Sequence, residues 1–172
     1  MLIDPLVDKL IVLMFLTFIP VFELRLSIPL GILKDKINLG FGYSLQGFGL
    51  PWPIVFAVCV FANAIIGPFV YFALDNFVHN VIAIKPIGVL YRKIVLRTQK
   101  KARPLVDKYG FLGLAVFIGI PLPGTGSWTG ALAAYLFGMS YKKFWLANFL
   151  GVLIAASIVT AMTLGVVSFF NV

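Results

Sequence analysis

The sequence predicts an all-α integral membrane protein, an inverted repeat of two re-entrant helical hairpins, each followed by a transmembrane helix. Three observations predict this class. Apolar residues make up 61% of the chain, and its mean hydropathy is +1.04, whereas soluble domains are closer to half apolar. Two apolar segments are long enough to cross a bilayer. Two others are interrupted by proline and polar residues, which a membrane tolerates only where protein or a water-filled cavity covers the backbone.

Residues 1–172 are predicted to form a single transmembrane domain with two halves. The first half covers about residues 8–74, a charged connection about 75–107, and the second half about 108–172. Each half has a broken segment and then a longer span that contains Ala-Asn followed by glycine. This order is typical of transporters built from inverted repeats. Acidic rather than basic residues precede the first segment, so we expect it to remain in the mature protein.

The first broken segment is bracketed by Pro20 and Pro29. A helix over residues 10–20 would be about 16 Å long, whereas the hydrocarbon core is about 30 Å thick. We therefore expect this limb to stop near the midplane and residues 26–33 to return, before residues 53–74 cross. Residues 38–52 are rich in glycine and aromatic rings, which predicts an interfacial loop. A lid over the outer mouth is the alternative.

The connection holds most of the positive charge. Eight of the 14 lysine and arginine residues lie within residues 85–108. Apolar residues at helical spacing predict an amphipathic helix on the inner membrane surface, with Pro86 and Pro104 at its ends. Cytoplasmic loops of membrane proteins are enriched in lysine and arginine. The positive charge of the connection therefore does not require a nucleic-acid partner. Membrane lipids are the expected partners, and binding of anionic headgroups to this connection is compatible with its cytoplasmic position.

The second half repeats the pattern of the first. Residues 110–120 and 128–139 are too short to cross, and residues 144–170 are long enough. The expected break residues are Pro121, Pro123, Gly124 and Gly126. Two re-entrant hairpins put ten of the 14 basic residues in the cytoplasm and both termini outside. The chain is thus expected to be a multi-pass protein of the cell membrane, with residues 85–108 cytoplasmic.

Glu23 and Arg25 are the ionisable residues inside the first broken segment. A charge at the membrane centre costs about 2.5–3.5 kcal/mol even on the lenient insertion scale. Extended backbone between the two prolines would place both side chains on one face. Glu23 would then carry a coupling proton, and Arg25 would hold an anionic group. The structural alternative is a buried ion pair that fixes the hairpin.

The second break offers hydroxyls, an indole and backbone amides rather than charge. A helix that begins near Ser127 would present free amides toward the midplane, which is an anion site; a turn that needs proline and glycine for geometry alone is the alternative. Asn63 and Asn148 are expected to bond helices, with a site-lining role second. The candidate substrate-binding residues are Arg25, Ser27, Thr125, Ser127, Trp128 and Thr129.

Enzymatic chemistry is not expected. No His, Cys and carboxylate cluster has metal-ligand spacing, and no nucleophile–base pair is visible. We therefore expect no metal, no cofactor and no catalytic residue. Cys59 lies alone in an apolar span, which is typical of a small buried hydrophobe.

Three motifs resemble the small multidrug export protein family, which is itself similar to the DedA superfamily of membrane proteins. They are Phe-Glu-Leu-Arg-Leu-Ser-Ile-Pro at 22–29, Pro-Leu-Pro-Gly-Thr-Gly-Ser-Trp-Thr-Gly at 121–130, and Phe-Trp-Leu-Ala-Asn-Phe-Leu-Gly at 144–151. The resemblance implies two oppositely oriented re-entrant hairpins. Through the DedA proteins it also implies proton-dependent transport of polyprenyl-phosphate or other phospholipids.

The same resemblance implies roles for particular residues. Glu23 matches the acidic position of the first hairpin. The arginines of the second hairpin have no counterpart within residues 110–139. Arg25, the hydroxyls and the helix-end amides would have to replace them.

The leading hypothesis is a transporter or flippase, coupled to protons, for an amphiphilic anionic substrate such as a polyprenyl-phosphate or phospholipid. The first alternative is a small multidrug or cation exporter in which Glu23 binds both proton and substrate. The second is a membrane-organising protein that transports nothing. The sequence does not decide the substrate, the coupling ion or whether the chain forms a homo-oligomer.

Overall fold

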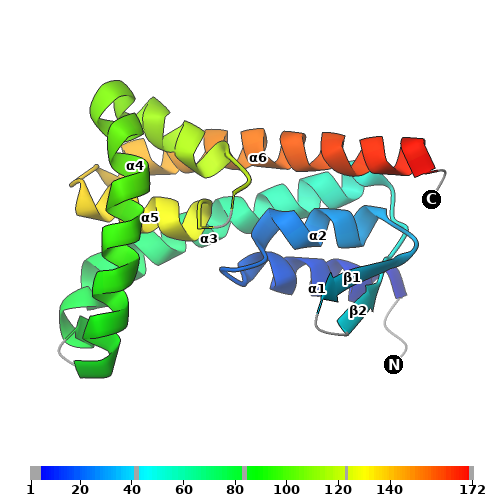
Figure 1. Cartoon of the computed structure of the whole chain (residues 1–172), viewed down its shortest axis with the longest axis horizontal. Coiled ribbons are helices and arrows are strands. Elements are labelled where there is room, and N and C mark those ends of the chain that lie inside the picture. Colours follow the sequence, from blue (N-terminus) through cyan, green and yellow to red (C-terminus); the bar gives the residue numbers. More distant parts are fainter. Residues whose placement is uncertain (1–4, 41–42, 83–84, 123, 171–172) are drawn as a thin grey trace. The chain divides into compact units, whose positions relative to one another are not determined.

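The computed structural model describes residues 5–40, 43–82, 85–122 and 124–170, and these form six helices and a two-stranded sheet (Figure 1). The predicted helical class is confirmed for most of the described chain, and the sheet is an addition. In chain order the elements are α1 (Pro5–Phe18), α2 (Glu23–Ile32), β1 (Lys36–Gly40), β2 (Tyr43–Gln46), α3 (Trp52–Ile82), α4 (Lys85–Gly119), α5 (Ser127–Leu136) and α6 (Tyr141–Phe170).

Two of the described helices, α3 and α6, are long and apolar enough to cross a membrane. Their apolar stretches are Trp52–Asn76, with 25 residues, and Tyr141–Phe169, with 29 residues; about 20 are enough. Both helices expose large apolar side chains, as helices in contact with lipid do: Phe61, Ile65, Phe69, Phe72, Met162, Val166 and Phe169. The two predicted spans are therefore present, although α3 continues to Ile82 instead of ending near residue 74.

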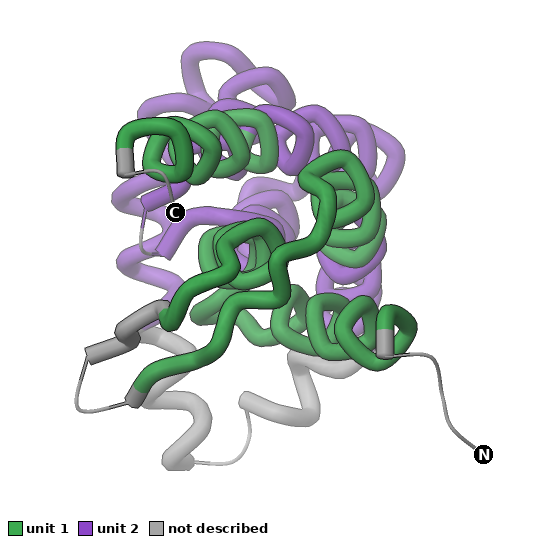
Figure 2. The backbone as a smooth tube through the Cα atoms, turned by 90° about the vertical axis from the view of Figure 1, so that its right-hand side faces the viewer, with its two compact units in different colours: residues 1–63, 155–172 green, residues 64–154 purple. Residues whose placement is uncertain are grey.

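The chain divides into two compact units (Figure 2). Unit 1 contains residues 1–63 and 155–172, and unit 2 contains residues 64–154. In unit 1, α1 contacts α2, and in unit 2, α4 contacts α5. Each unit also contains a part of α3 and a part of α6.

In unit 1, α1 and α2 run antiparallel and pack against each other (Figure 1). The contact is close because α2 has a glycine where it meets its neighbours. A Cβ on Gly31 would lie 2.5 Å from Val55 Cγ1 of α3 and 3.1 Å from Leu13 Cδ1 of α1. Leu13, Ile28 and Val55 are completely buried here.

The segment after α2 forms an antiparallel hairpin where the sequence predicted an interfacial loop. Ile37 of β1 pairs with Leu45 of β2. The chain then returns along α2: the Phe48 amide donates to the Leu30 carbonyl oxygen at 2.8 Å, and the Leu50 amide to that of Gly31 at 2.8 Å. Because the last carbonyls of a helix have no intrahelical partner, these bonds cap α2 and tie the segment to it.

In unit 2, α4 consists of two helical parts that meet at a kink at Gly110, where φ is 57° and ψ is −129°. The first part is the predicted amphipathic helix, with Thr98 and Ala102 buried. The prediction that Pro104 ends this helix is wrong, because the helix continues to the kink. Pro104 is exposed, and a positive φ that only glycine adopts easily reverses the chain instead.

The second part of α4 runs antiparallel to α5 (Figure 1). Ile118 lies between two glycines at this contact. A Cβ on Gly130 of α5 would lie 2.5 Å from Ile118 Cδ1, and one on Gly151 of α6 would lie 2.6 Å from Ile118 Cβ. These glycines therefore let the end of α4 approach both neighbours closely.

Tyr71 fixes α3 against the start of α6 within unit 2. Its hydroxyl donates to the Met139 carbonyl oxygen at 2.6 Å. Its ring stacks on Phe144, with the centroids 5.1 Å apart. A half-buried tyrosine with a satisfied hydroxyl and an aromatic neighbour orients the elements that carry it.

Candidate functional site

The first break is a short turn between α1 and α2. The amides of Phe22 and Glu23 both donate to the Ile19 carbonyl oxygen, at 3.1 Å each. Pro20 lies in this turn, as predicted, but Pro29 lies inside α2. The extended stretch expected between the two prolines is therefore absent. Proline's fixed φ is compatible with a helix, but Pro29 lacks the N–H that would bond the Arg25 carbonyl oxygen, and its ring crowds that carbonyl.

Glu23 begins α2 in a strained backbone conformation. Its φ is +41°, the one positive value among the non-glycine residues that the structure describes. The left-handed region costs a non-glycine residue about 1–2 kcal/mol. The side chain is also only 3% exposed. A buried carboxyl group on strained backbone persists only where the surroundings enforce it, and such residues gather at functional sites.

Arg25 lies close enough to Glu23 for the two opposite charges to attract each other. On a regular helix, residues two apart do not face each other. Here the left-handed backbone of Glu23 departs from regular helical geometry at the first residue of α2. The two charges thus lie within electrostatic reach of each other on helical rather than extended backbone.

Ser27 takes part in a buried polar cluster that links α1, α2 and α3. Its hydroxyl donates to the Glu23 carbonyl oxygen at 2.8 Å and accepts from the Thr17 hydroxyl at 2.9 Å. The Cys59 thiol is within hydrogen-bonding reach of both hydroxyls. The Ser27 hydroxyl is therefore engaged inside the protein, and its predicted contact with substrate stays a prediction.

The second break is the loop between α4 and α5, and Thr125 holds it together. The Leu122 amide donates to the Thr125 hydroxyl oxygen at 3.2 Å, and that oxygen lies 2.7 Å from the Leu122 carbonyl oxygen. Gly124 and Gly126 have φ values of +81° and +116°, which glycine adopts without strain. Pro121 is the loop's described proline, and Pro123 lies outside the described residues.

The helix α5 begins at Ser127, as the sequence predicted. Ser127 is completely buried, and its hydroxyl has no hydrogen-bond partner among the residues that the structure describes. The Thr129 hydroxyl, by contrast, donates to the Gly126 carbonyl oxygen at 3.3 Å, and Trp128 is half-buried. Of the three hydroxyls predicted to bind substrate at this break, only that of Ser127 therefore lacks a described protein contact.

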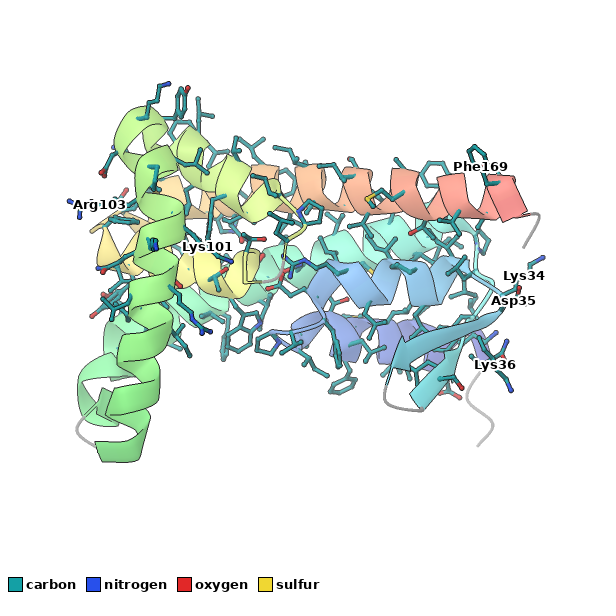
Figure 3. All side chains as sticks on the ribbon, viewed as in Figure 1. Lys34, Asp35, Lys36, Lys101, Arg103 and Phe169 are labelled. Atoms are coloured by element: carbon teal, nitrogen blue, oxygen red, sulfur yellow. The ribbon has the colours of Figure 1, made fainter. Side chains whose placement is uncertain are left out.

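Lys101 is a candidate that the sequence reasoning missed. It extends from α4 on the side of α5, whereas Arg103 points away (Figure 3). A Cβ on Gly124 would lie 3.4 Å from the Lys101 ammonium nitrogen. One signal was available: Lys101 follows the buried Thr98 by three residues and precedes the half-buried Leu105 by four, so it borders the packed face of the helix although its own side chain is exposed.

Asn148 bonds α6 to α3 within unit 2. Its side-chain amide donates to the Ala64 carbonyl oxygen at 3.3 Å. A Cβ on Gly67 would lie 2.5 Å from the Asn148 amide oxygen, so glycine makes room for this side chain. The amide oxygens of Asn63 and Asn148 are both buried, with no hydrogen-bond partner in the described part of the chain. No group of His, Cys, Asp or Glu side chains in the described ranges is placed to hold a metal ion.

Comparison with known proteins gives one match. A family model described as "Putative small multi-drug export protein" matches residues 23–158, which is most of the chain. The matched region begins at the strained glutamate and includes the second break. No curated protein and no solved structure is significantly similar to the chain.

Proposed function

Because this chain belongs to the small multi-drug export protein family, we propose that it is a membrane transporter whose working site is built around Glu23. The proposed activity is proton-coupled transport, or flipping between leaflets, of an amphiphilic anionic substrate. A polyprenyl-phosphate or a phospholipid has this chemistry. Residues 22–29 and 121–130 resemble motifs of the small multidrug export family, whose similarity to the DedA superfamily supports the same substrate class, although residues 110–139 lack the arginines of the DedA second hairpin.

The strained, buried Glu23 is the observation that carries this proposal. A carboxyl group inside a membrane protein is costly unless a partner or a cavity compensates it. Glu23 has a partner of opposite charge in Arg25. A proton that binds Glu23 would weaken this attraction and release Arg25 for an anionic group, which gives a physical route to coupling.

Helix lengths support a re-entrant arrangement. With 14 residues α1 is about 21 Å long, and with ten residues α2 is about 15 Å long. Neither spans a hydrocarbon core of about 30 Å. In unit 2, α5 is equally short, with ten residues. Each unit thus contains one pair of short helical segments, with the part of α4 after Gly110 as the partner of α5, and a part of each long apolar helix, which supports an inverted repeat with broken helices at the site.

The test is transport in proteoliposomes under an imposed proton gradient. The substrate is a fluorescent polyprenyl-phosphate, and its exposure on the outer leaflet is followed by dithionite quenching. We expect the gradient to accelerate its movement and Glu23→Gln to remove this response. Asp35→Asn is the matched control, because Asp35 is an exposed acid in the same unit. Movement without any gradient response, or a Glu23→Gln variant that behaves as the wild type, would refute the proposal.

The family description favours a second candidate, a small exporter of cationic drugs that uses Glu23 as the shared site for proton and substrate. The positive charge of Arg25 close to Glu23 opposes cation binding there. An Arg25→Ala variant that keeps or gains cation transport would favour this candidate over an anionic substrate.

A non-transport role as a membrane-organising protein is the third candidate. In that case Glu23 and Arg25 would form a structural pair. A Glu23→Gln/Arg25→Gln double variant that retains full function in cells would support this role, whereas loss of function in a folded double variant would exclude it.

A further inference from the structure

Within unit 2, the second part of α4 runs parallel to the first part of α6. A Cβ on Gly151 would lie 2.7 Å from the Ala115 carbonyl oxygen, and one on Gly119 would lie 2.9 Å from Ile154 Cβ. Both contacts advance in the same direction along the two helices, so the helices are parallel. Residues that precede these contacts by equal numbers of positions therefore lie at about the same level, because an α-helix rises by a constant step.

Aromatic and basic side chains gather at one level of this helix pair. Tyr109, just before the kink, precedes Ala115 by six residues. Trp145 precedes Gly151 by the same number. Tyr109 and Trp145 thus lie at about the same level. Lys108 adds its ammonium group there, 5.0 Å from the centre of the Tyr109 ring.

The start of α6 presents a preformed aromatic surface. Tyr141, Lys142 and Trp145 line a cavity of about 310 Å³, and both rings are exposed. The Trp145 ring stacks on Phe149, with the centroids 5.9 Å apart. The Tyr141 ring meets the Tyr71 ring edge-on at 5.6 Å. Because such ring contacts have preferred geometries, they hold the exposed rings in place.

The polarity of the surface changes at the same level. Beyond it both helices expose apolar side chains, which are Leu112, Val116, Leu146 and Phe149. Residues 109–141 and 144–172 contain no charge. On the other side of this level, the first part of α4 is basic and runs across the direction of the first turns of α6 (Figure 1). A change from basic to apolar surface, with tyrosine and tryptophan at the boundary, is typical of the headgroup level of a bilayer.

We propose that this surface, the interfacial belt formed by Lys108, Tyr109, Tyr141, Lys142 and Trp145, contacts the headgroup layer of the bilayer and prefers anionic headgroups. The rings lie among the headgroups, and the lysine stems extend along them so that the ammonium groups reach the anionic layer. The chain enters the bilayer at the Gly110 kink. The belt is an outer surface of unit 2 that holds resident lipids, so the inference does not depend on transport or on what is transported.

Depth-dependent quenching of tryptophan fluorescence tests the level of the belt. The full chain with Trp52→Phe and Trp128→Phe retains Trp145 as its one tryptophan. It is reconstituted in phosphatidylcholine vesicles that carry a nitroxide either on the headgroup or deep in the acyl chain. We expect the headgroup nitroxide to quench Trp145 more strongly than the acyl nitroxide does.

Two further reporters, each combined with Trp145→Phe, locate the boundary. Tyr109→Trp should give the same ratio of headgroup to acyl quenching as Trp145. Phe149→Trp lies one turn farther along α6, which is about 6 Å. It should be quenched more strongly by the acyl nitroxide.

Lipid selectivity tests the charge and requires no tryptophan replacement. Electron paramagnetic resonance compares the association of spin-labelled phosphatidylglycerol and phosphatidylcholine with the full chain at low salt. We expect the wild type to prefer phosphatidylglycerol, and Lys142→Gln to lower this preference by up to about fivefold. Lys142→Arg should retain it. Arg103→Gln is the control for net charge, because Arg103 is already paired with Asp107 at 3.3 Å.

Several results would overturn the inference. Stronger acyl than headgroup quenching of Trp145, or different depths for the reporters at 109 and 145, would exclude a shared headgroup level. Absence of quenching by either nitroxide would show that protein covers the surface. An unchanged preference in Lys142→Gln, or an equal loss in Arg103→Gln, would remove the local role of Lys142. The proposed function fails separately, because a protein that passes all these tests could still move no substrate.

Discussion

The Thr17 hydroxyl of α1 lies 2.9 Å from the Ser27 hydroxyl of α2 and 2.7 Å from the Leu13 carbonyl oxygen, so its one proton is shared between two acceptors. Thr17 and Ser27 are both completely buried. Cys59 of α3 lies within reach of both. Ser27 in turn donates to the carbonyl oxygen of the strained Glu23. This small polar cluster therefore connects the backbone of the candidate site to the two helices packed around it.

Loss of the Thr17–Ser27 bond should destabilise unit 1 modestly. Buried hydrogen bonds in membrane proteins contribute about 0.6 kcal/mol on average and up to about 1.7 kcal/mol. We expect Ser27→Ala and Thr17→Val each to lower the free energy of unfolding by about 1 kcal/mol. The double variant should lose less than the sum of the two, because both remove the same bond. Unfolding by steric trapping measures these energies, and strictly additive losses would contradict the predicted coupling.

The same variants separate the structural role of Ser27 from its predicted contact with substrate. If the hydroxyl serves only the cluster, Ser27→Ala should transport its substrate with an unchanged KM. A raised KM in Ser27→Ala, with Thr17→Val unchanged, would assign the hydroxyl to substrate instead.

Overpacking between α4 and α5 gives a second prediction. Gly130→Ala would place its Cβ 2.5 Å from Ile118 Cδ1, and inserting a methyl group into a packed contact costs about 1–3 kcal/mol. We expect the variant to melt at a lower temperature. Ile118→Val, which removes that Cδ1, should restore part of the loss in the double variant. Absence of any rescue would show that another contact limits the space at Gly130.

The features that depend on length and polarity could be predicted from the sequence. The two long spans follow from uninterrupted apolar stretches, and the start of α5 at Ser127 follows from the polar loop before it. The proline signals were less informative. Pro29 and Pro104 both lie inside helices, because a proline removes one amide but does not forbid helical φ.

Other features depend on contacts that no local pattern encodes. The strained φ of Glu23 is imposed by the turn before it. The segment that contains the hairpin of β1 and β2 also donates hydrogen bonds to the carbonyl oxygens at the end of α2, which have no partner within the helix. Lys101 was missed because charge on an amphipathic helix is usually solvated, and its neighbour Gly124 is 23 residues away along the chain.

Replacement by alanine should change the stability of the protein in opposite directions at Gly110 and at Gly165. Nothing lies within 4 Å of a Cβ built on Gly110 or on Gly165. Gly110→Ala should nevertheless destabilise the protein by about 1–2 kcal/mol, because its φ of +57° is strained for alanine. Gly165→Ala lies inside α6 and should stabilise it by up to about 1 kcal/mol. Thermal melts of the two variants check this prediction. If both melting temperatures shifted in the same direction, backbone strain at Gly110 would not explain the effect of Gly110→Ala.

The membrane topology gives the last prediction. If both short helical pairs are re-entrant, Ser44 of β2 lies outside and Ser140, just before α6, lies in the cytoplasm. Both serines are exposed, so Ser44→Cys should react with a membrane-impermeant maleimide in intact cells, and Ser140→Cys only after permeabilisation. The wild-type chain is the control, because its completely buried Cys59 should stay unlabelled. If the second broken segment crossed the membrane once instead, Ser140→Cys would be labelled in intact cells as well. That result would move Lys142 and Lys143 outside and weaken the charge asymmetry on which the orientation rests.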